Sequence, residues 1–254
     1  MESVMAPPAR GLEAAEQIIG LGESRGVRLR LLGGLAFKKL CPSANAARYS
    51  RENKDIDLIG RHENQKEVVK IMETLGYKPR EMFNKLSMGK RLIYYDMGNR
   101  RRVDIFFDEF EMCHKFNFRD SLEAGKVTLP ITELVMTKLQ VMEKTEKEYK
   151  DLLAAFSDFE VTEGPKGIDG SKIAAMCATD WGVYTTFTKS LSALKQWARE
   201  MVGDDQGLVV GRIDSLQSML DSKPKTLAWR MRSRIGEKAR WYDTPEADGD
   251  SMLG

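Results

Sequence analysis

Two aspartates set two positions apart, Asp55 and Asp57, constrain this chain more than any other feature of its sequence. Leu58 and Ile59 follow them, which predicts that the pair begins a β-strand. Side chains at positions i and i+2 of a strand point to the same face, so the two carboxylates are expected side by side. Paired carboxylates of this kind are suited to holding a hard divalent cation.

A glycine pair precedes these acids, and a third acid follows them. Gly33-Gly34 ends an apolar stretch, and Asp104 lies between Val103 and Ile105 on a second predicted strand. We expect the glycines to form the turn from a strand into a helix, where backbone N–H groups can receive phosphate. Taken singly, each motif has a plainer interpretation, since Gly-Gly is common in turns and exposed acid pairs are often only solvated.

The composition is that of a globular protein. The chain has 254 residues, of which 42% are hydrophobic and 31% charged, and its net charge is +2. No apolar run approaches the roughly 18 residues of a membrane span, and residues 1–11 lack the apolar core of a signal peptide. These features favour a cytoplasmic location with no membrane partner. Cys41, Cys113 and Cys177 are widely spaced, and we expect reduced thiols.

The first half of the chain predicts a mixture of short strands and helices. Gly98-Asn99 separates two apolar runs, which indicates a hairpin. We therefore expect an α+β fold in which helices flank a short mixed sheet. The predicted helices are 12–21, 35–40 and 64–75, and the predicted strands are 27–32, 55–60, 92–95 and 103–107.

After Pro130 the apolar spacing becomes helical. We expect helices at 131–143 and 146–156 and an all-helical region from Ser171 onward. The segment 158–170 is rich in glycine and acidic residues, which predicts a domain boundary. The predicted organisation is a first domain at 1–157, a helical C-terminal domain at 171–242 and a flexible tail at 243–254.

The order of these motifs resembles the nucleotidyltransferase superfamily, which includes DNA polymerase beta and the minimal nucleotidyltransferases. That pattern is a hydrophobic strand, Gly-Gly or Gly-Ser, Asp-x-Asp and a third acid on a later strand. Within it the chain is most similar to the AbiEii-type branch, known as toxins of toxin–antitoxin pairs. The residues 51–58 resemble that branch's Arg-x-Thr-x-Asp-Ile-Asp-Leu motif, with Asn53 in place of threonine and a longer preceding loop. The resemblance covers about residues 27–156.

The resemblance implies that residues 1–157 form a nucleotidyltransferase domain that uses an NTP as substrate and Mg²⁺ or Mn²⁺ as cofactor. It makes Asp55, Asp57 and Asp104 the metal-binding and catalytic acids. Further expected site residues are catalytic Lys138 and the nucleotide-binding set Gly33, Gly34, Arg51, Lys138 and Asp151. From the residues alone, a lysine at position 138 is more often a snorkelling surface residue. Asp151 is expected either to orient Lys138 or a metal-bound water, or simply to pair with Lys147.

Basic residues are concentrated near the C-terminus. The predicted nucleic-acid-binding residues are Lys223, Lys225, Arg230, Arg232, Arg234, Lys238 and Arg240. The alternative is a basic amphipathic helix in which Trp229, Trp241, Leu227, Met231 and Ile235 fill the helical core, and for the tryptophans we expect the core. A second basic run, residues 100–102, is expected either to steer phosphates or to be solvated.

The function expected from these features is Mg²⁺-dependent transfer of an NMP from an NTP to an acceptor hydroxyl. The AbiEii-type resemblance implies a tRNA end as acceptor and a cognate antitoxin as partner. Transfer to a small molecule or to a protein hydroxyl is compatible with the same motifs. From a different class, the chain can be a non-catalytic nucleotide- or RNA-binding protein that keeps the fold.

Overall fold

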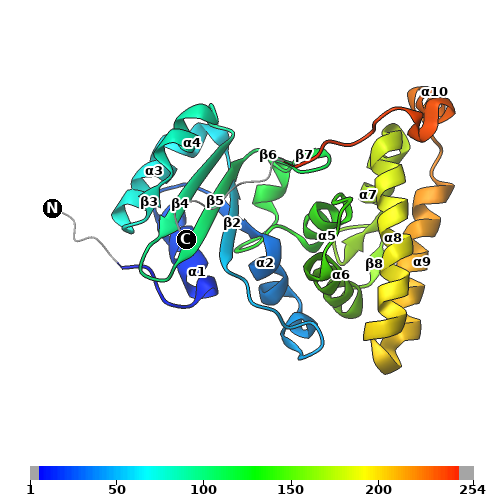
Figure 1. Cartoon of the computed structure of the whole chain (residues 1–254), viewed down its shortest axis with the longest axis horizontal. Helices are drawn as coiled ribbons and strands as arrows, with labels where there is room; N and C mark the ends of the chain where they lie inside the picture. The colour runs from blue at the N-terminus through cyan, green and yellow to red at the C-terminus, as the bar shows by residue number, and fades with distance from the viewer. Residues whose placement is uncertain (1–5, 246–254) are drawn as a thin grey trace.

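The computed structural model describes residues 6–245 and contains one central sheet with helices on both sides (Figure 1). The five strands lie in the order β1-β2-β5-β4-β3. Only the β2–β5 pair is parallel, and the other neighbours are antiparallel. The strands are β1 (Leu29–Leu32), β2 (Asp55–Gly60), β3 (Lys78–Pro79), β4 (Arg91–Asp96) and β5 (Arg101–Phe107).

The middle strand of the sheet, β5, is buried along its whole length although it carries three charged residues, Arg101, Arg102 and Asp104. Every residue of β5 is buried, as expected for a strand with neighbours on both edges and helices over its faces. The β4–β5 hairpin confirms the sequence prediction, with Tyr94 opposite Val103. The helices of this half are α1 (Gly11–Ser24), α2 (Gly33–Leu40), α3 (Gln65–Thr74) and α4 (Glu81–Leu86).

Helices make up most of the second half of the chain. They are α5 (Ile131–Leu139), α6 (Glu146–Asp158), α7 (Gly170–Thr179), α8 (Trp181–Met201), α9 (Gln206–Ser222) and α10 (Leu227–Ile235). Helix α2 contacts both the sheet and the pair α5–α6, and α5 and α6 in turn pack on α8 and α9. The sheet and the C-terminal helices are therefore joined through α2, α5 and α6 (Figure 1).

Several short elements differ from the expected pattern. The predicted boundary at 158–170 holds a short parallel pair, β8 (Val161–Thr162) with β9 (Ile168–Asp169), which leads directly into α7. Two further strands, β6 (Glu109–Glu111) and β7 (Lys115–Asn117), form a small hairpin after β5. The 3₁₀ turns are η1 (Pro42–Asn45), η2 (His62–Asn64), η3 (Asp120–Glu123), η4 (Gly203–Asp205) and η5 (Gly236–Lys238).

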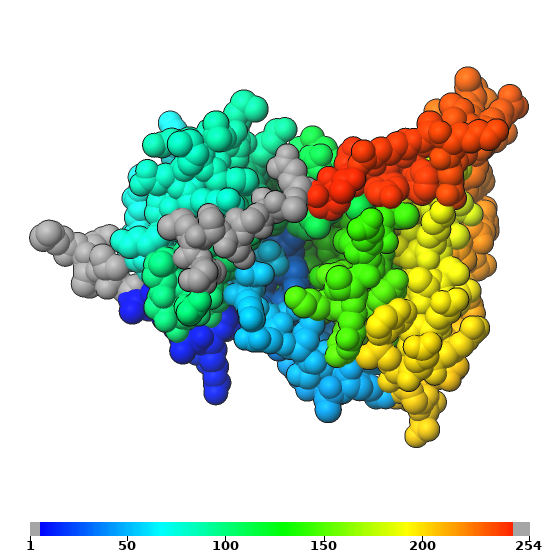
Figure 2. Space-filling model, in the orientation of Figure 1, coloured from blue at the N-terminus to red at the C-terminus, as the bar shows by residue number. Residues whose placement is uncertain are grey.

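The chain returns to the sheet-bearing half after α10. Figure 2 shows this last described segment in red, running from α10 across the top of the molecule. The N–H of Asp243 donates to the carbonyl oxygen of Cys113 at 3.0 Å. Residues 243–245 of the predicted flexible tail are thus attached, whereas 246–254 lie outside the described residues.

The architecture confirms the predicted α+β class, with a short mixed sheet and flanking helices. Within residues 6–245, no helix is both long enough and apolar enough to cross a membrane.

Candidate active site

The parallel pairing of β2 and β5 brings the predicted acids together. Asp57 lies opposite Asp104, and Asp55 lies opposite Arg102. Because all four side chains occupy alternate positions of adjacent strands in register, they share one face of the sheet. Asp55 is exposed at the edge of this group, whereas Asp104 is only 3% exposed.

The two glycines leave space for the side chains around this face. Gly33 begins α2 with a positive φ of 67°, and a Cβ there would collide with the carboxylate of Asp57. A Cβ on Gly34 would collide with the side chains of Arg51 and Asn53. Any larger residue at either position therefore has to displace predicted site residues or adopt a strained backbone. The predicted turn from strand into helix is confirmed.

Asp57 is the acid whose environment is least favourable to its charge. No ion pair to its carboxylate is present within the described part of the chain. Burial, followed by the like charges of Asp104 and Asp55, raises the pKa of Asp57 to about 7. Lys138 and Arg91 act in the opposite direction without cancelling the effect. A cation bound beside Asp57 would relieve this repulsion.

Asp104 has a different environment, because two arginines bind its oxygens. Arg91 Nη2 lies 2.7 Å from Oδ1, and Arg102 Nε lies 2.8 Å from Oδ2. Arg102 is buried, whereas the side chain of Arg91 is 27% exposed. The sequence interpretation missed both roles, and it offered residues 100–102 only as phosphate-steering or solvated. Arg102 stands at position i−2 from Asp104, and that spacing on one strand is a signal that could have predicted the pair.

Three predicted nucleotide-binding residues form one ionic network. They are Arg51 in the loop before β2, Lys138 on α5 and Asp151 on α6. Asp151 is 5% exposed and accepts from Arg51 at 2.7 Å and from Lys138 at 3.0 Å. Glu148 lies 3.7 Å from Lys138 as well. Desolvation opposes the charge on Lys138, but Asp151 and Glu148 outweigh it and raise its pKa. Asp151 therefore orients Lys138, and the pairing with Lys147 is not observed among the ion pairs of residues 6–245.

A cavity of about 250 Å³ lies beside the three acids and Lys138. It is lined by the predicted residues Gly33, Asp55, Asp57, Asp104 and Lys138. A second cavity of about 500 Å³ adjoins it and shares Arg91, Phe106 and Met112. The far wall of this second cavity includes Asp243, Thr244 and Pro245 from the returning C-terminal segment. The predicted acids and lysine thus face one space that continues into a larger one.

Of the three predicted metal-binding acids, only Asp55 and Asp57 are placed well for binding a divalent cation. Among residues 6–245, no group of three His, Cys, Asp or Glu side chains is arranged to hold a metal ion. Asp55 and Asp57 offer carboxylate oxygens to the smaller cavity, where burial and the like charges of Asp104 and Asp55 raise the pKa of Asp57. Asp104 already accepts bonds from its two arginines. The three-aspartate metal site stays a prediction, and Asp55 and Asp57 are the residues that fit it best.

The C-terminal basic residues do not form one uniform surface. Lys225 lies over the Tyr184 ring at 4.9 Å, and Arg232 lies over Trp181 at 4.6 Å and donates to the carbonyl oxygen of Gly236. These two cations are structural. The remaining predicted nucleic-acid-binding residues are exposed, and they are Lys223, Arg230, Arg234, Lys238 and Arg240. Arg230 and Arg234 lie on α10, Lys223 precedes this helix, Lys238 and Arg240 follow it, and none of the five lines the cavity of the acids.

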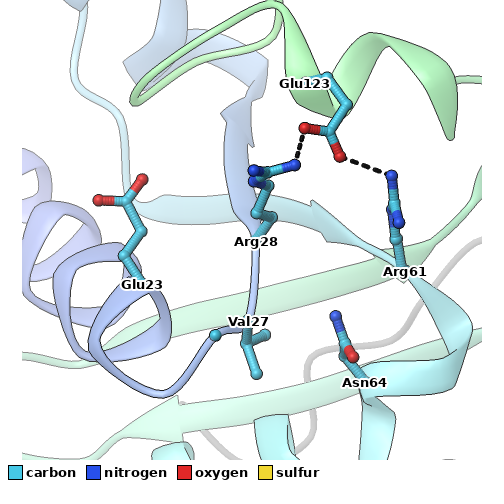
Figure 3. Close-up of a pocket in the computed structure, with 7 residues that line it drawn as sticks. Glu23, Val27, Arg28, Arg61, Asn64 and Glu123 are labelled. Atoms are coloured by element: carbon cyan, nitrogen blue, oxygen red, sulfur yellow. Dashed lines mark hydrogen bonds and ion pairs between the residues drawn. The ribbon is translucent and has the colours of Figure 1, made fainter.

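A further polar pocket lies near the N-terminal end of β1, and its charges are balanced (Figure 3). Glu123 extends between Arg28 and Arg61 and forms an ion pair with each. Glu23 lines the same pocket and contacts Arg30 at 3.4 Å. Its carboxylates therefore have cationic partners.

Comparison with known proteins gives limited information. No family model and no curated protein matches the chain. Among solved structures, the chain is similar to the solution structure of the antibiotic-resistance factor ANT(2'')-Ia, with 18% sequence identity and a TM-score of 0.37. The match covers 56% of this chain and 80% of that chain. A likeness this weak does not identify the function, which has to be argued from the site.

Proposed function

We propose that this protein is a metal-dependent nucleotidyltransferase. The observation that carries the proposal is the register of β2 and β5, which sets Asp57 opposite Asp104 beside the Gly33 turn. Nucleotidyl transfer requires neutralisation of the triphosphate and an oriented acceptor hydroxyl rather than covalent help from the protein. Acids, a glycine turn and a buried lysine around one cavity support both requirements.

In this proposal the site residues have separate roles. Asp55 and Asp57 hold the divalent cation, and Gly33 and Gly34 present backbone N–H groups to the phosphates at the start of α2. Lys138, oriented by Asp151, stabilises the charge on the leaving pyrophosphate. The cation, when bound, neutralises phosphate charge and lowers the pKa of the acceptor hydroxyl.

The acceptor approaches from the side of Asp104. The hydroxyl oxygen of the acceptor bonds to the α-phosphorus of the NTP. The bond from that phosphorus to the bridging oxygen breaks, and pyrophosphate leaves. The hydroxyl proton passes to Asp104. Asp104 borders the smaller cavity, and the larger cavity adjoins it across Arg91 and Phe106. The larger cavity is therefore the proposed acceptor space, and its volume of about 500 Å³ is sufficient for one nucleotide or a comparable small molecule.

We infer a tRNA end as the first acceptor to test, with growth arrest and a cognate antitoxin as the associated biology, because of the resemblance to AbiEii-type toxins. A small molecule or a protein hydroxyl is the alternative for the same centre. The larger cavity supports an acceptor that presents a compact end, which all three classes can provide.

The test is incubation of the purified protein with α-labelled NTPs, Mg²⁺ and, separately, total RNA, protein or small metabolites. We expect label on RNA, and label found only on protein or on a small molecule would refute the tRNA acceptor. Asp55→Ala/Asp57→Ala should abolish labelling, whereas Glu123→Gln in the balanced pocket should not. Metal-dependent NTP binding equal in the double variant and the parent would refute the proposed mechanism. Mg²⁺-independent RNA binding without labelling would support the non-catalytic alternative.

A further inference from the structure

Helix α10 exposes a stripe of large apolar side chains. Leu227 is 67% exposed, Met231 60% and Ile235 50%. They recur every fourth residue, which places them on one face of the helix over two turns. We call these three residues the α10 stripe. It contradicts the alternative interpretation in which the same three residues fill the helical core.

The α10 stripe belongs to a helix whose opposite face is partly buried against α8. The Thr226 side chain caps the helix by accepting from the Trp229 N–H at 3.2 Å. The Trp229 ring meets Tyr184 edge-on with centroids 5.3 Å apart, and Arg232 covers Trp181. These contacts turn Trp229 and Arg232 toward α8 and leave the α10 stripe exposed.

A basic edge runs beside the stripe. Arg230 and Arg234 are exposed one helical turn apart on α10, and the exposed Lys238 follows in η5. Within residues 6–245, none of them forms an ion pair, and the nearby Glu237 pairs with Lys189 instead. The helix contacts α7, α8 and η5 and projects at the far end of the molecule from the sheet (Figures 1 and 2).

We propose that the α10 stripe is a docking site for an acidic amphipathic helix of a partner protein. Three apolar side chains in line match the ridge that one helix presents to another. The cations on the edge select a partner with carboxylates flanking its own apolar face. This inference does not depend on the proposed nucleotidyl transfer.

Charge and side-chain type argue against other occupants. A second copy docked by the same face would bring Arg230 and Arg234 against their own counterparts, and like charges across an interface are costly. RNA would satisfy the cations but leave the apolar stripe exposed to water. For a membrane surface, the aromatic residue best suited to the lipid interface is Trp229, and it is turned inward against Tyr184.

The test uses the full chain and two synthetic peptides of about 20 residues, long enough to hold a helix. One peptide carries leucines on one face with glutamates beside them, and the other has the same composition with the leucines scattered around the helix. We expect micromolar binding of the first peptide by calorimetry, weakening as salt is added, and at least about tenfold weaker binding of the second.

Three variants separate the two parts of the surface. Met231→Ser/Ile235→Ser and Arg230→Glu/Arg234→Glu should each weaken binding at least about tenfold, and the second should bind a lysine-flanked version of the peptide instead. Leu208→Ser is the matched control, because Leu208 is an equally exposed apolar residue on α9, at 53%. It should bind the first peptide as the parent does. Unchanged circular dichroism spectra would show that every variant remains folded.

The proposal is overturned if the scattered peptide binds equally well or if Leu208→Ser weakens binding to the same degree. It is also overturned if short RNA or anionic phosphatidylserine vesicles bind through the stripe while the first peptide does not. Sedimentation that shows a dimer lost in Met231→Ser/Ile235→Ser would identify a second copy as the occupant.

Discussion

Two charged pockets of the sheet-bearing half differ in how their carboxylates are satisfied. In the balanced pocket, Glu123 lies between Arg28 and Arg61 and is paired with both (Figure 3). In the acid pocket, Asp57 lies near Asp55 and Asp104 without an ion pair of its own among the described residues. A fold that can pair Glu123 so fully has no structural need to leave Asp57 in a repulsive environment. The contrast supports the proposal that Asp57 and its neighbours hold a cation beside a phosphate-bearing substrate.

The largest expected difference between the pockets is in catalysis. Asp57→Asn keeps the size of the side chain and removes the charge that the proposed cation needs. We expect nucleotidyl transfer to fall by at least about 10²–10³-fold, the size seen when one electrostatic stabiliser is lost. Glu123→Gln makes the same chemical change in the balanced pocket and should leave the rate of transfer unchanged. Equal loss in both variants would contradict the assignment of the acid pocket.

The next largest effect is expected at Asp151. This buried carboxylate pairs with Arg51 and Lys138, and Asp151→Asn removes the charged partner of Arg51 and leaves Lys138 with Glu148 alone. We expect the free energy of unfolding to fall by about 3 kcal/mol, because removing one member of a buried ion pair strands the other. Urea denaturation measures this change. A decrease no larger than that of an exposed ion pair would show that Asp151 contributes little to the network.

Asp57→Asn should have the opposite effect on stability in the metal-free protein. The folded pKa of Asp57 is raised to about 7 from 3.8, so the native state binds more protons than the unfolded state between these values. The free energy of unfolding should therefore fall as pH rises from about 4 to about 7, by an amount on the order of 1–2 kcal/mol after solvent screening.

The pH dependence supplies the control for that prediction. The decrease in the free energy of unfolding with rising pH should be absent in Asp57→Asn, which should be more stable than the parent near neutral pH. Thermal unfolding in a chelator over this pH range tests the difference. Added Mg²⁺ should stabilise the parent but not the variant, and an identical pH profile in both proteins would rule out the proposed strain at Asp57.

The smallest effect is expected in the balanced pocket. Arg28 and Glu123 have side chains about half exposed, where solvent screens ion pairs strongly. Glu123→Gln should lower the free energy of unfolding by less than about 1 kcal/mol, and added salt should reduce the difference further. A loss comparable to that of Asp151→Asn would mean that the two pockets are equally important for stability.

The sequence predicted the acid set and its strands because those features depend on local pattern. The alternation around Asp55 and Asp57, the Gly33 turn and the β4–β5 hairpin all follow from residues close together in the chain. It did not predict that Arg91 and Arg102 bind Asp104. Arginine on a strand is compatible with solvent or with a partner, and only the packing around it decides which.

The C-terminal region was harder to interpret for the same reason. The sequence showed that α10 is basic and amphipathic, but one helix cannot show which of its faces finds a neighbour. The structure turns Trp229 and Arg232 toward α7 and α8 and leaves Met231 exposed. Trp229 and Trp241, which were expected in the core, are only partly buried, and the apolar aliphatic residues of α10 are exposed.

By itself the sequence determined the chemistry available to this protein. Asp55 and Asp57 share a face because side chains alternate along a strand with a two-residue period, whereas Asp104 joins them only through the pairing of β2 with β5. Only the tertiary structure decided which charges are neutralised, because ion pairs such as Asp151 with Lys138 join elements far apart in the chain. It likewise decided which apolar residues are buried, since burial depends on what packs against a helix rather than on the helix alone.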